Sequence, residues 1–198
     1  MVLTTIWNEE YSVIKKLYLG NLHFMNKWKK VFSEIVFSKY GKAIEHKDFI
    51  LPNGKLLDFY IYNAGDPVCV LALTANNEVI MAKQFRVGPE AVLMELPGGM
   101  IDKNETPETA IKRELLEETG YVGDFQFVTQ CIDGAYNTID RYCFVATNCK
   151  KVAEPKLDDS EFVEVIATPL LEFRNHLRTG RLSDVEVAYL GLDFLNLL

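Results

Sequence analysis

The segment that decides the fold reads GGMIDKNETPETAIKRELLEETGY and covers residues 98–121. It places five glutamates close together, at positions 105, 108, 114, 117 and 118, with Lys112 and Arg113 as the strong bases between the first and the last of them. Like charges at this density repel one another on an exposed helix, so the segment needs a physical reason for its composition.

The helix within this segment has clear sequence boundaries. Thr106 is a good N-cap, Pro107 suits the first helical position, and Gly120 suits the left-handed conformation that ends many helices. The sequence therefore predicts a helix over residues 107–119.

Three carboxylates are expected on one face of that helix. At about 100° per residue, Glu114, Glu117 and Glu118 fall within roughly one 100° sector, together with Ala110. Glu114 and Glu118 form a like-charged pair four residues apart, which is unfavourable unless a cation lies between them. Clustered carboxylate oxygens suit Mg²⁺ or Mn²⁺, both of which bind substrate phosphates alongside a few protein ligands.

The alternative interpretation is a solvated surface helix held by ion pairs. Glu108 and Lys112 have the spacing for one such pair, and Arg113 and Glu117 have the spacing for another. These pairs account for two of the acids and leave the Glu114–Glu118 pair unexplained.

The residues before the helix favour a binding site. ELPGGMID, residues 95–102, is expected to end an apolar strand in a Pro-Gly-Gly turn, where the missing side chains let a backbone carbonyl approach a metal or a phosphate.

Strands dominate the rest of the chain. Short runs of alternating or continuous apolar residues predict strands near residues 33–40, 48–62, 67–74, 78–86, 124–132, 141–147 and 161–170, with a hairpin turn at Pro52-Asn53-Gly54. Two helices are expected at the end, one over residues 170–180 that Gly180 ends, and one that Ser183 caps.

The chain reads as one main domain. Residues 1–27 form an N-terminal extension with apolar residues at helical spacing, which either caps the core or precedes it as an appendage. Residues 28–198 are expected to form a single domain, with an N-terminal β-hairpin region at 28–62 and a core at 63–198.

Composition narrows the function. The chain has 198 residues and a net charge of −7, which counts against a nucleic-acid-binding surface. No apolar run reaches the length of about 20 residues that a membrane span needs, and no secretory signal is evident, so we expect a cytoplasmic protein. The four cysteines show no metal-type spacing and are expected to be reduced, with a Cys131–Cys143 disulfide as the alternative.

The opening segment resembles the Nudix box, G-x5-E-x7-R-E-U-x-E-E-x-G-U, where U is a bulky aliphatic residue. The matching residues are Gly99, Glu105, Arg113, Glu114, Leu115, Glu117, Glu118 and Gly120. Tyr121 replaces the final aliphatic residue, at a packing position. A match of this length and spacing is specific.

The wider chain, from about Trp28 onward, resembles the ADP-ribose or ADP-sugar pyrophosphatase branch of this family, through LPNGK, QFR, ELPGGMID and a late acidic loop. The resemblance implies an α/β fold, an α/β/α sandwich around a mixed β-sheet with an N-terminal β-region. It also implies dependence on Mg²⁺, with Mn²⁺ as the alternative, hydrolysis of a nucleoside diphosphate linked to another moiety, and a homodimer.

The resemblance also assigns roles to residues of this chain. It implies metal ligands at Glu114, Glu117, Glu118 and the Gly98 carbonyl, with Arg113 holding the carboxylates and Glu105 in support. It implies substrate contacts at Arg86, Glu95 and Met100. Glu161 in the acidic loop aligns best with the residue that takes a proton from water, and Asp159 is the alternative.

Several functions stay open at this point. Residues 131–144 contain no proline where the ADP-ribose subgroup has one, so GDP-mannose, another nucleotide sugar or a dinucleotide competes with ADP-ribose as substrate. A catalytically silent ligand sensor is the alternative of another class, but such a sensor can lose the metal glutamates, and this chain keeps them.

Overall fold

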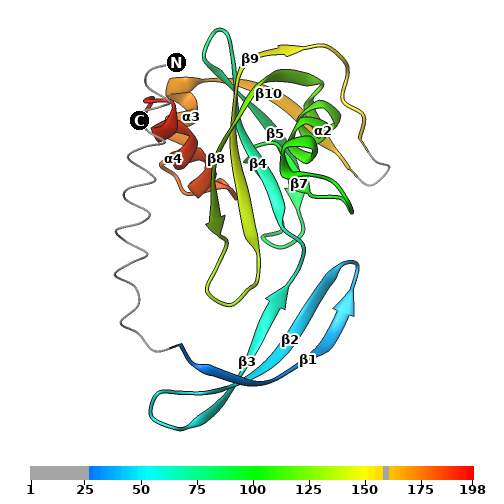
Figure 1. Ribbon diagram of the computed structural model, residues 1–198. Coiled ribbons are helices and arrows are strands. Elements are labelled where there is room, and N and C mark those ends of the chain that lie inside the picture. Colours follow the sequence, from blue (N-terminus) through cyan, green and yellow to red (C-terminus); the bar gives the residue numbers. More distant parts are fainter. Residues whose placement is uncertain (1–26, 158–160) are drawn as a thin grey trace. The chain divides into compact units, whose positions relative to one another are not determined.

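The structure is a computed structural model that describes residues 27–157 and 161–198 (Figure 1). The chain divides into two compact units. Unit 1 contains the described residues up to Ala64 together with Gly134–Thr138, and unit 2 contains Gly65–Asp133 and Ile139–Leu198. The helix predicted within residues 1–27 lies outside the described residues, apart from Lys27, and so does Asp159.

Unit 1 is a three-stranded antiparallel sheet in the order β1-β2-β3. The strands are β1 (Lys29–Lys39), β2 (Lys42–Ile50) and β3 (Leu56–Asn63). The predicted hairpin turn joins β2 to β3, where Gly54 has a φ of 80° and its N–H donates to the Leu51 carbonyl at 2.9 Å. Residues 134–138 extend this unit, because the Tyr62 N–H donates to the Tyr136 carbonyl at 2.9 Å.

Unit 2 is built on a seven-stranded sheet with the main order β10-β5-β4-β9-β8, to which β6 adds on β5 and β7 on β4. Its strands are β4 (Pro67–Thr74), β5 (Glu78–Arg86), β6 (Ala91–Glu95), β7 (Gly98–Met100), β8 (Tyr121–Ile132), β9 (Asp140–Lys151) and β10 (Val163–Pro169). The sheet is mixed, since β4 and β9 run parallel while the neighbours β8 and β9 are antiparallel.

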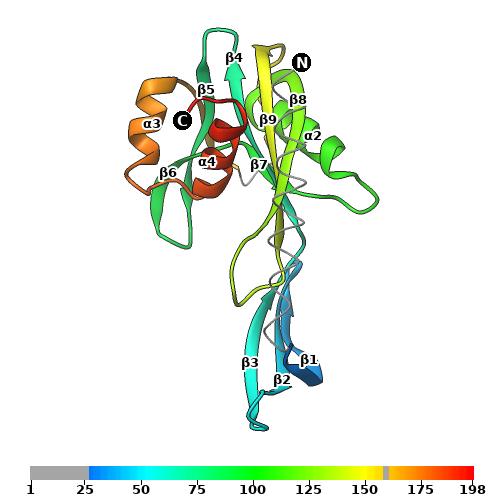
Figure 2. The same ribbon diagram turned by 60° about the vertical axis from the view of Figure 1, so that its left-hand side comes forward.

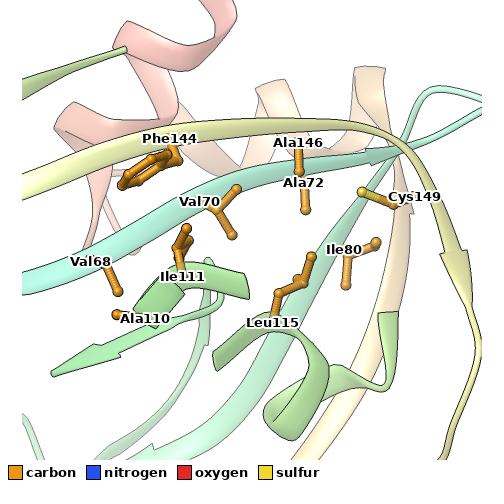
Figure 3. Close-up of a cluster of buried hydrophobic side chains, with 10 residues drawn as sticks. All are labelled: Val68, Val70, Ala72, Ile80, Ala110, Ile111, Leu115, Phe144, Ala146 and Cys149. Carbon is orange, nitrogen blue, oxygen red and sulfur yellow. The ribbon is translucent and has the colours of Figure 1, made fainter. Parts of the chain in front are cut away.

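Helices cover both faces of this sheet, as Figure 2 shows. They are α2 (Pro107–Thr119), α3 (Leu170–Leu177) and α4 (Val185–Phe194). Strand β4 is buried along nearly its whole length, which explains its continuous apolar run. Val70 packs on the α2 face with Ile111 and Leu115, as Figure 3 shows, while the next residue, Leu71, lies against Gly191 of α4. The predicted helix-sheet-helix layering is confirmed.

Helix α2 has the boundaries that its sequence predicts. The Thr106 side chain accepts a hydrogen bond from the Thr109 N–H, and Gly120 has a φ of 76°. The predicted N-cap of α4 was wrong by one residue. Asp184 precedes the first helical residue, and the Ser183 hydroxyl donates to the Asp184 carboxylate at 2.8 Å instead of capping the helix.

The predicted Pro-Gly-Gly turn was also wrong, because the glycines form a strand. Gly98 and Gly99 belong to β7, which pairs with β4 through Cys69 and Val68. A Cβ atom on Gly98 would lie 2.3 Å from the Val68 carbonyl oxygen, so only glycine permits this approach. The glycines allow the backbones of β7 and β4 to pack closely together, next to helix α2.

Within the described part of the chain, no helix has the length and apolar character needed to cross a bilayer.

Candidate active site

Arg113 gathers the acids of the glutamate-rich segment. Its Nη1 lies 2.8 Å from Glu114 Oε1 and 3.2 Å from Glu117 Oε2, and its Nη2 lies 2.9 Å from Glu105 Oε2. The same Nη2 donates to the Met100 carbonyl at 3.1 Å. The hydrogen bond from Arg113 lowers the pKa of Glu105, and the same contact does most to raise the pKa of Arg113. Arg113 thus fixes two neighbouring glutamates on one side of α2.

Glu118 lies in a more buried place than the other glutamates of α2. Burial raises the pKa of Glu118 to about 8, and the negative charge of Glu114 raises it further. The Gly98 N–H donates to Glu118 Oε2 at 3.0 Å, which partly offsets this effect on the pKa. A carboxylate in such surroundings is costly to ionise, and a cation beside it would remove that cost.

Glu114 lies directly under Gly99. A Cβ atom on Gly99 would come within 2.3 Å of Glu114 Oε1, so the glycine makes room for this carboxylate. Burial is the main cause of the raised pKa of Glu114, and the charges of Glu117 and Glu161 add to it. The glycines of β7 therefore hold Glu114 and Glu118 close to the backbone of the sheet.

The acids fit a divalent cation chemically, although they are not yet arranged as a closed cage. Over residues 27–157 and 161–198, no three His, Cys, Asp or Glu side chains are placed as a ready-made metal site. The carboxylates of Glu114 and Glu117 do not converge on one point because each forms an ion pair with Arg113. The donor set is all oxygen, which is the ligand chemistry that Mg²⁺ and Mn²⁺ prefer.

Arg86 and Glu95 form a second pair beside this cluster. Arg86 Nε lies 2.5 Å from Glu95 Oε2, and the side chain of Glu95 is only 2% exposed. Gln84 donates to the same oxygen at 3.0 Å, a contact that the sequence interpretation missed. Gln84 and Arg86 lie two residues apart on β5, so the strand period could have indicated that they share a face. The positive charge of Arg86 also lowers the pKa of Glu118.

Comparison with known proteins decides the family. A family model described as the NUDIX domain matches residues 65–187, which begin where unit 2 begins. The chain is 33% identical to the ADP-ribose pyrophosphatase of Bacillus subtilis over 174 residues, covering 85% of this chain and 92% of that protein. This chain belongs to the Nudix family.

Two further similarities extend this finding. The chain is 31% identical to the methanol dehydrogenase activator of Bacillus methanolicus, covering 83% of this chain and 93% of that protein. A crystal structure of an ADP compounds hydrolase matches with a TM-score of 0.72 and 19% identity, covering 88% of this chain and 98% of that one. The second likeness establishes the fold, a Nudix-type α/β/α sandwich around a mixed sheet with an N-terminal β-region.

The Nudix hydrolases in general use divalent metals. Glu161 follows the acidic loop, and its negative charge raises the pKa of both Glu114 and Glu118. Met100 ends β7 with its side chain 47% exposed. The structure thus brings Glu161 within electrostatic range of the α2 acids and leaves Met100 accessible at the end of the glycine strand.

Proposed function

We propose that this Nudix enzyme hydrolyses the pyrophosphate bond of a nucleoside diphosphate joined to a sugar, most favourably an ADP-sugar such as ADP-ribose. The products are a nucleoside monophosphate and a sugar phosphate. The observation that carries the proposal is the pair of partly buried glutamates, Glu114 and Glu118, held against the glycines of β7. The similarity to an ADP-ribose pyrophosphatase over most of both chains supports the substrate class.

Mg²⁺ is the proposed cofactor, with Mn²⁺ as the alternative. Glu114, Glu117, Glu118 and the Gly98 carbonyl would hold it, since together they offer the oxygen ligands that these ions prefer. When bound, such an ion neutralises charge on the pyrophosphate oxygens and acidifies a coordinated water. Binding would draw Glu114 and Glu117 partly away from Arg113, which keeps its contact with Glu105.

Arg86 is the proposed contact for the negatively charged part of the substrate. Its Nε is held by the buried carboxylate of Glu95, which orients the guanidinium group. A guanidinium fixed on one side presents its other N–H groups in the fork geometry that suits phosphate oxygens. Glu95 then acts mainly by holding Arg86, and Met100 offers an exposed apolar contact at the end of β7.

Glu161 is proposed to take the proton from the attacking water. The water oxygen bonds to phosphorus, the bridging oxygen leaves with the electrons of the broken bond, and the Glu161 carboxylate receives the water proton. Support comes from the charge of Glu161, which acts on both Glu114 and Glu118. Asp159 competes for this role from just outside the described residues.

We also propose that the enzyme is a homodimer formed through unit 1. Five apolar residues of β1 are exposed to 44% or more, namely Val31, Phe32, Ile35, Val36 and Phe37. So many exposed apolar side chains on a three-stranded sheet need a cover, and a second copy supplies one. Light scattering should give twice the 22.6 kDa of one chain, and the monomer mass would contradict the proposal.

The free cysteines and the net charge of −7 are consistent with a cytoplasmic enzyme that does not bind nucleic acid, which is also our proposal.

The test is a screen of the purified chain with Mg²⁺ against ADP-ribose, ADP-glucose, GDP-mannose and NADH. Added phosphatase releases phosphate from the products and not from the intact diphosphates, so phosphate reports turnover. We expect ADP-ribose or ADP-glucose to give the highest kcat/KM, and Glu118→Gln to remove the signal. Preference for GDP-mannose would change the substrate but keep the chemistry, whereas tight binding without turnover would make the protein a ligand sensor.

A further inference from the structure

Two cysteines lie side by side on unit 2, away from the α2 acids. Cys131 on β8 and Cys143 on β9 place their sulfur atoms 3.4 Å apart. In the antiparallel register Cys131 pairs with Arg141 and Cys143 pairs with Thr129, so the two cysteines are diagonal neighbours on the same face of the sheet. A disulfide needs about 2.05 Å between the sulfur atoms, so for this diagonal pair the side chains must rotate and the two strands must move slightly toward each other.

The neighbouring residues hold this end of the hairpin in place. Arg141 Nη2 lies 2.7 Å from Asp133 Oδ1, and Arg141 Nη1 lies 3.0 Å from Asp184 Oδ1 and also contacts Glu186. These contacts tie the ends of β8 and β9 to the start of α4. These contacts keep the two cysteines close to each other in the folded protein.

The other two cysteines have different surroundings. Cys69 is 3% exposed and lies within β4, and Cys149 is 5% exposed and donates to the Thr147 carbonyl at 3.9 Å. Cys131, in contrast, is only partly buried and is therefore the more accessible of the pair to an oxidant.

We propose that Cys131 and Cys143 are a site of reversible disulfide formation, with a small-molecule disulfide such as oxidised glutathione as the oxidant. The Cys131 thiolate attacks one glutathione sulfur, which releases the first reduced glutathione and leaves a mixed disulfide. Cys143 loses its proton to solvent and attacks the Cys131 sulfur, which releases the second reduced glutathione. Two protein thiols are oxidised and one glutathione disulfide is reduced.

The surroundings set the rate of this reaction. Burial raises the pKa of both thiols, and the charges of Glu186 and Asp133 add to this for Cys131, whereas the Arg141 guanidinium lowers the pKa of Cys131. Because the thiolate is the nucleophile, oxidation should be slow at neutral pH and faster as the pH rises.

The disulfide would close a loop of chain that leaves unit 2, passes through unit 1 and returns to unit 2. Cys131 and Cys143 are twelve positions apart, and the chain between them includes Gly134–Thr138, the part of unit 1 that pairs with β3 through Tyr62. Closing this loop restricts the unfolded chain and therefore favours the folded state. Oxidation should raise the thermal midpoint of the protein, and reduction should restore it.

The test incubates the native full-length chain with oxidised glutathione at pH 8 and maps the products with trypsin. Trypsin cuts after Arg113, Arg141 and Lys150, so Cys131 lies in peptide 114–141, while Cys143 and Cys149 share peptide 142–150. Cys149→Ser therefore assigns the bond without ambiguity and also serves as the matched control. We expect the free thiols to fall from four to two in the natural chain, with peptides 114–141 and 142–150 joined in both proteins.

Three results would overturn the proposal. They are retention of all four thiols in the folded protein, stable glutathione adducts without a linked peptide pair, and linkage of either peptide to the peptide that carries Cys69. Cys131→Ser should lose both the linked peptides and the oxidant-dependent rise in thermal midpoint. A rise that persists in Cys131→Ser would also exclude this pair as its cause.

Discussion

Two arginines in unit 2 each collect at least three carboxylates, but the partners come from different distances along the chain. Arg113 contacts Glu105, Glu114 and Glu117, which belong to α2 or to the loop directly before it. Arg141 contacts Asp133, Asp184 and Glu186, and so joins the end of a hairpin to the start of α4. The first cluster positions carboxylates along one helix and the loop before it, whereas the second connects separate secondary-structure elements.

The clusters also differ in the acids that remain beside them. Glu118 lies next to the Arg113 cluster, partly buried and with its pKa raised, and it accepts a hydrogen bond from the Gly98 N–H. This surplus of negative charge favours a cation. At the Arg141 cluster, each of the three acids contacts the arginine itself, and the side chains of Arg141 and Asp184 are both 15% exposed. We therefore expect the first cluster to control activity and the second to control stability.

The largest expected effect is on the activity side. Glu118→Gln keeps the size and the hydrogen bond to Gly98 but removes the charge, so kcat should fall by on the order of 10³-fold. The control is Glu108→Gln on the same helix, because Glu108 is 64% exposed and pairs only with Lys112 at 2.5 Å among the contacts described. Steady-state assays should show less than about a twofold change for the control. Equal losses in both variants would refute the division of the acids.

Arg141→Leu tests the other side of the comparison. It leaves Asp184 and Glu186 without their cation, and the free energy of unfolding should fall by about 3–5 kcal/mol in urea denaturation. Lys83→Met removes the exposed pair with Glu164 and should cost less than about 1 kcal/mol. Folded Arg141→Leu protein should keep a kcat within a fewfold of the natural chain. A large fall in kcat at unchanged stability would show that this cluster serves the chemistry.

Gly99→Ala should disturb the active site without changing any charge. The added methyl group would lie 2.3 Å from Glu114 Oε1, so the carboxylate must move. Displacement of a ligand by about 1 Å can cost about 10²-fold in rate, and we expect a loss of kcat of about 10–10²-fold. Gly88→Ala is the matched control, because a Cβ there meets no atom within 4 Å. Equal kcat values for both variants would contradict the claim that Gly99 makes room for the Glu114 carboxylate.

A pH effect on stability should be the smallest of the four. Burial raises the pKa of Asp184 from 3.8 to about 6, with Arg141 and Ser183 lowering it and Glu95 and Glu186 raising it further. The folded state therefore binds this proton more tightly than the unfolded state, so this contribution to stability is lost as pH rises from about 4 through 6. Asp184→Asn cannot titrate, and relative to it the natural chain should lose about 2 kcal/mol between pH 4 and pH 7.

Denaturation of both proteins at the two pH values measures this difference. A difference that does not change with pH would mean that Asp184 remains ionised throughout.

The sequence predicted the parts of this account that depend on neighbouring residues. Thr106, Pro107 and Gly120 define α2 because capping is local, and the helical period places Glu114 and Glu118 on one face for the same reason. The assignment of Ser183 as a cap failed because its hydroxyl donates to Asp184, whose carboxylate also pairs with the distant Arg141, and no side chain among the described residues caps this helix end.

Contacts between residues that are distant in the sequence could not be predicted from local sequence patterns. Gly98 and Gly99 look like a turn in the sequence, and only their register with β4 shows that they form a strand. The Arg141 cluster joins residues 133, 141, 184 and 186, whose spacing carries no signal. Gln84 was missed because its partner Glu95 lies on the next strand.

The most direct test of the central claim, that the acids of α2 hold a divalent cation, is Mn²⁺ binding followed by the electron paramagnetic resonance signal of the free ion. The natural chain and Glu108→Gln should both reduce that signal at stoichiometric Mn²⁺, and Glu118→Gln should leave it close to that of buffer. Equal binding by Glu118→Gln and the natural chain, with both folded, would contradict the account.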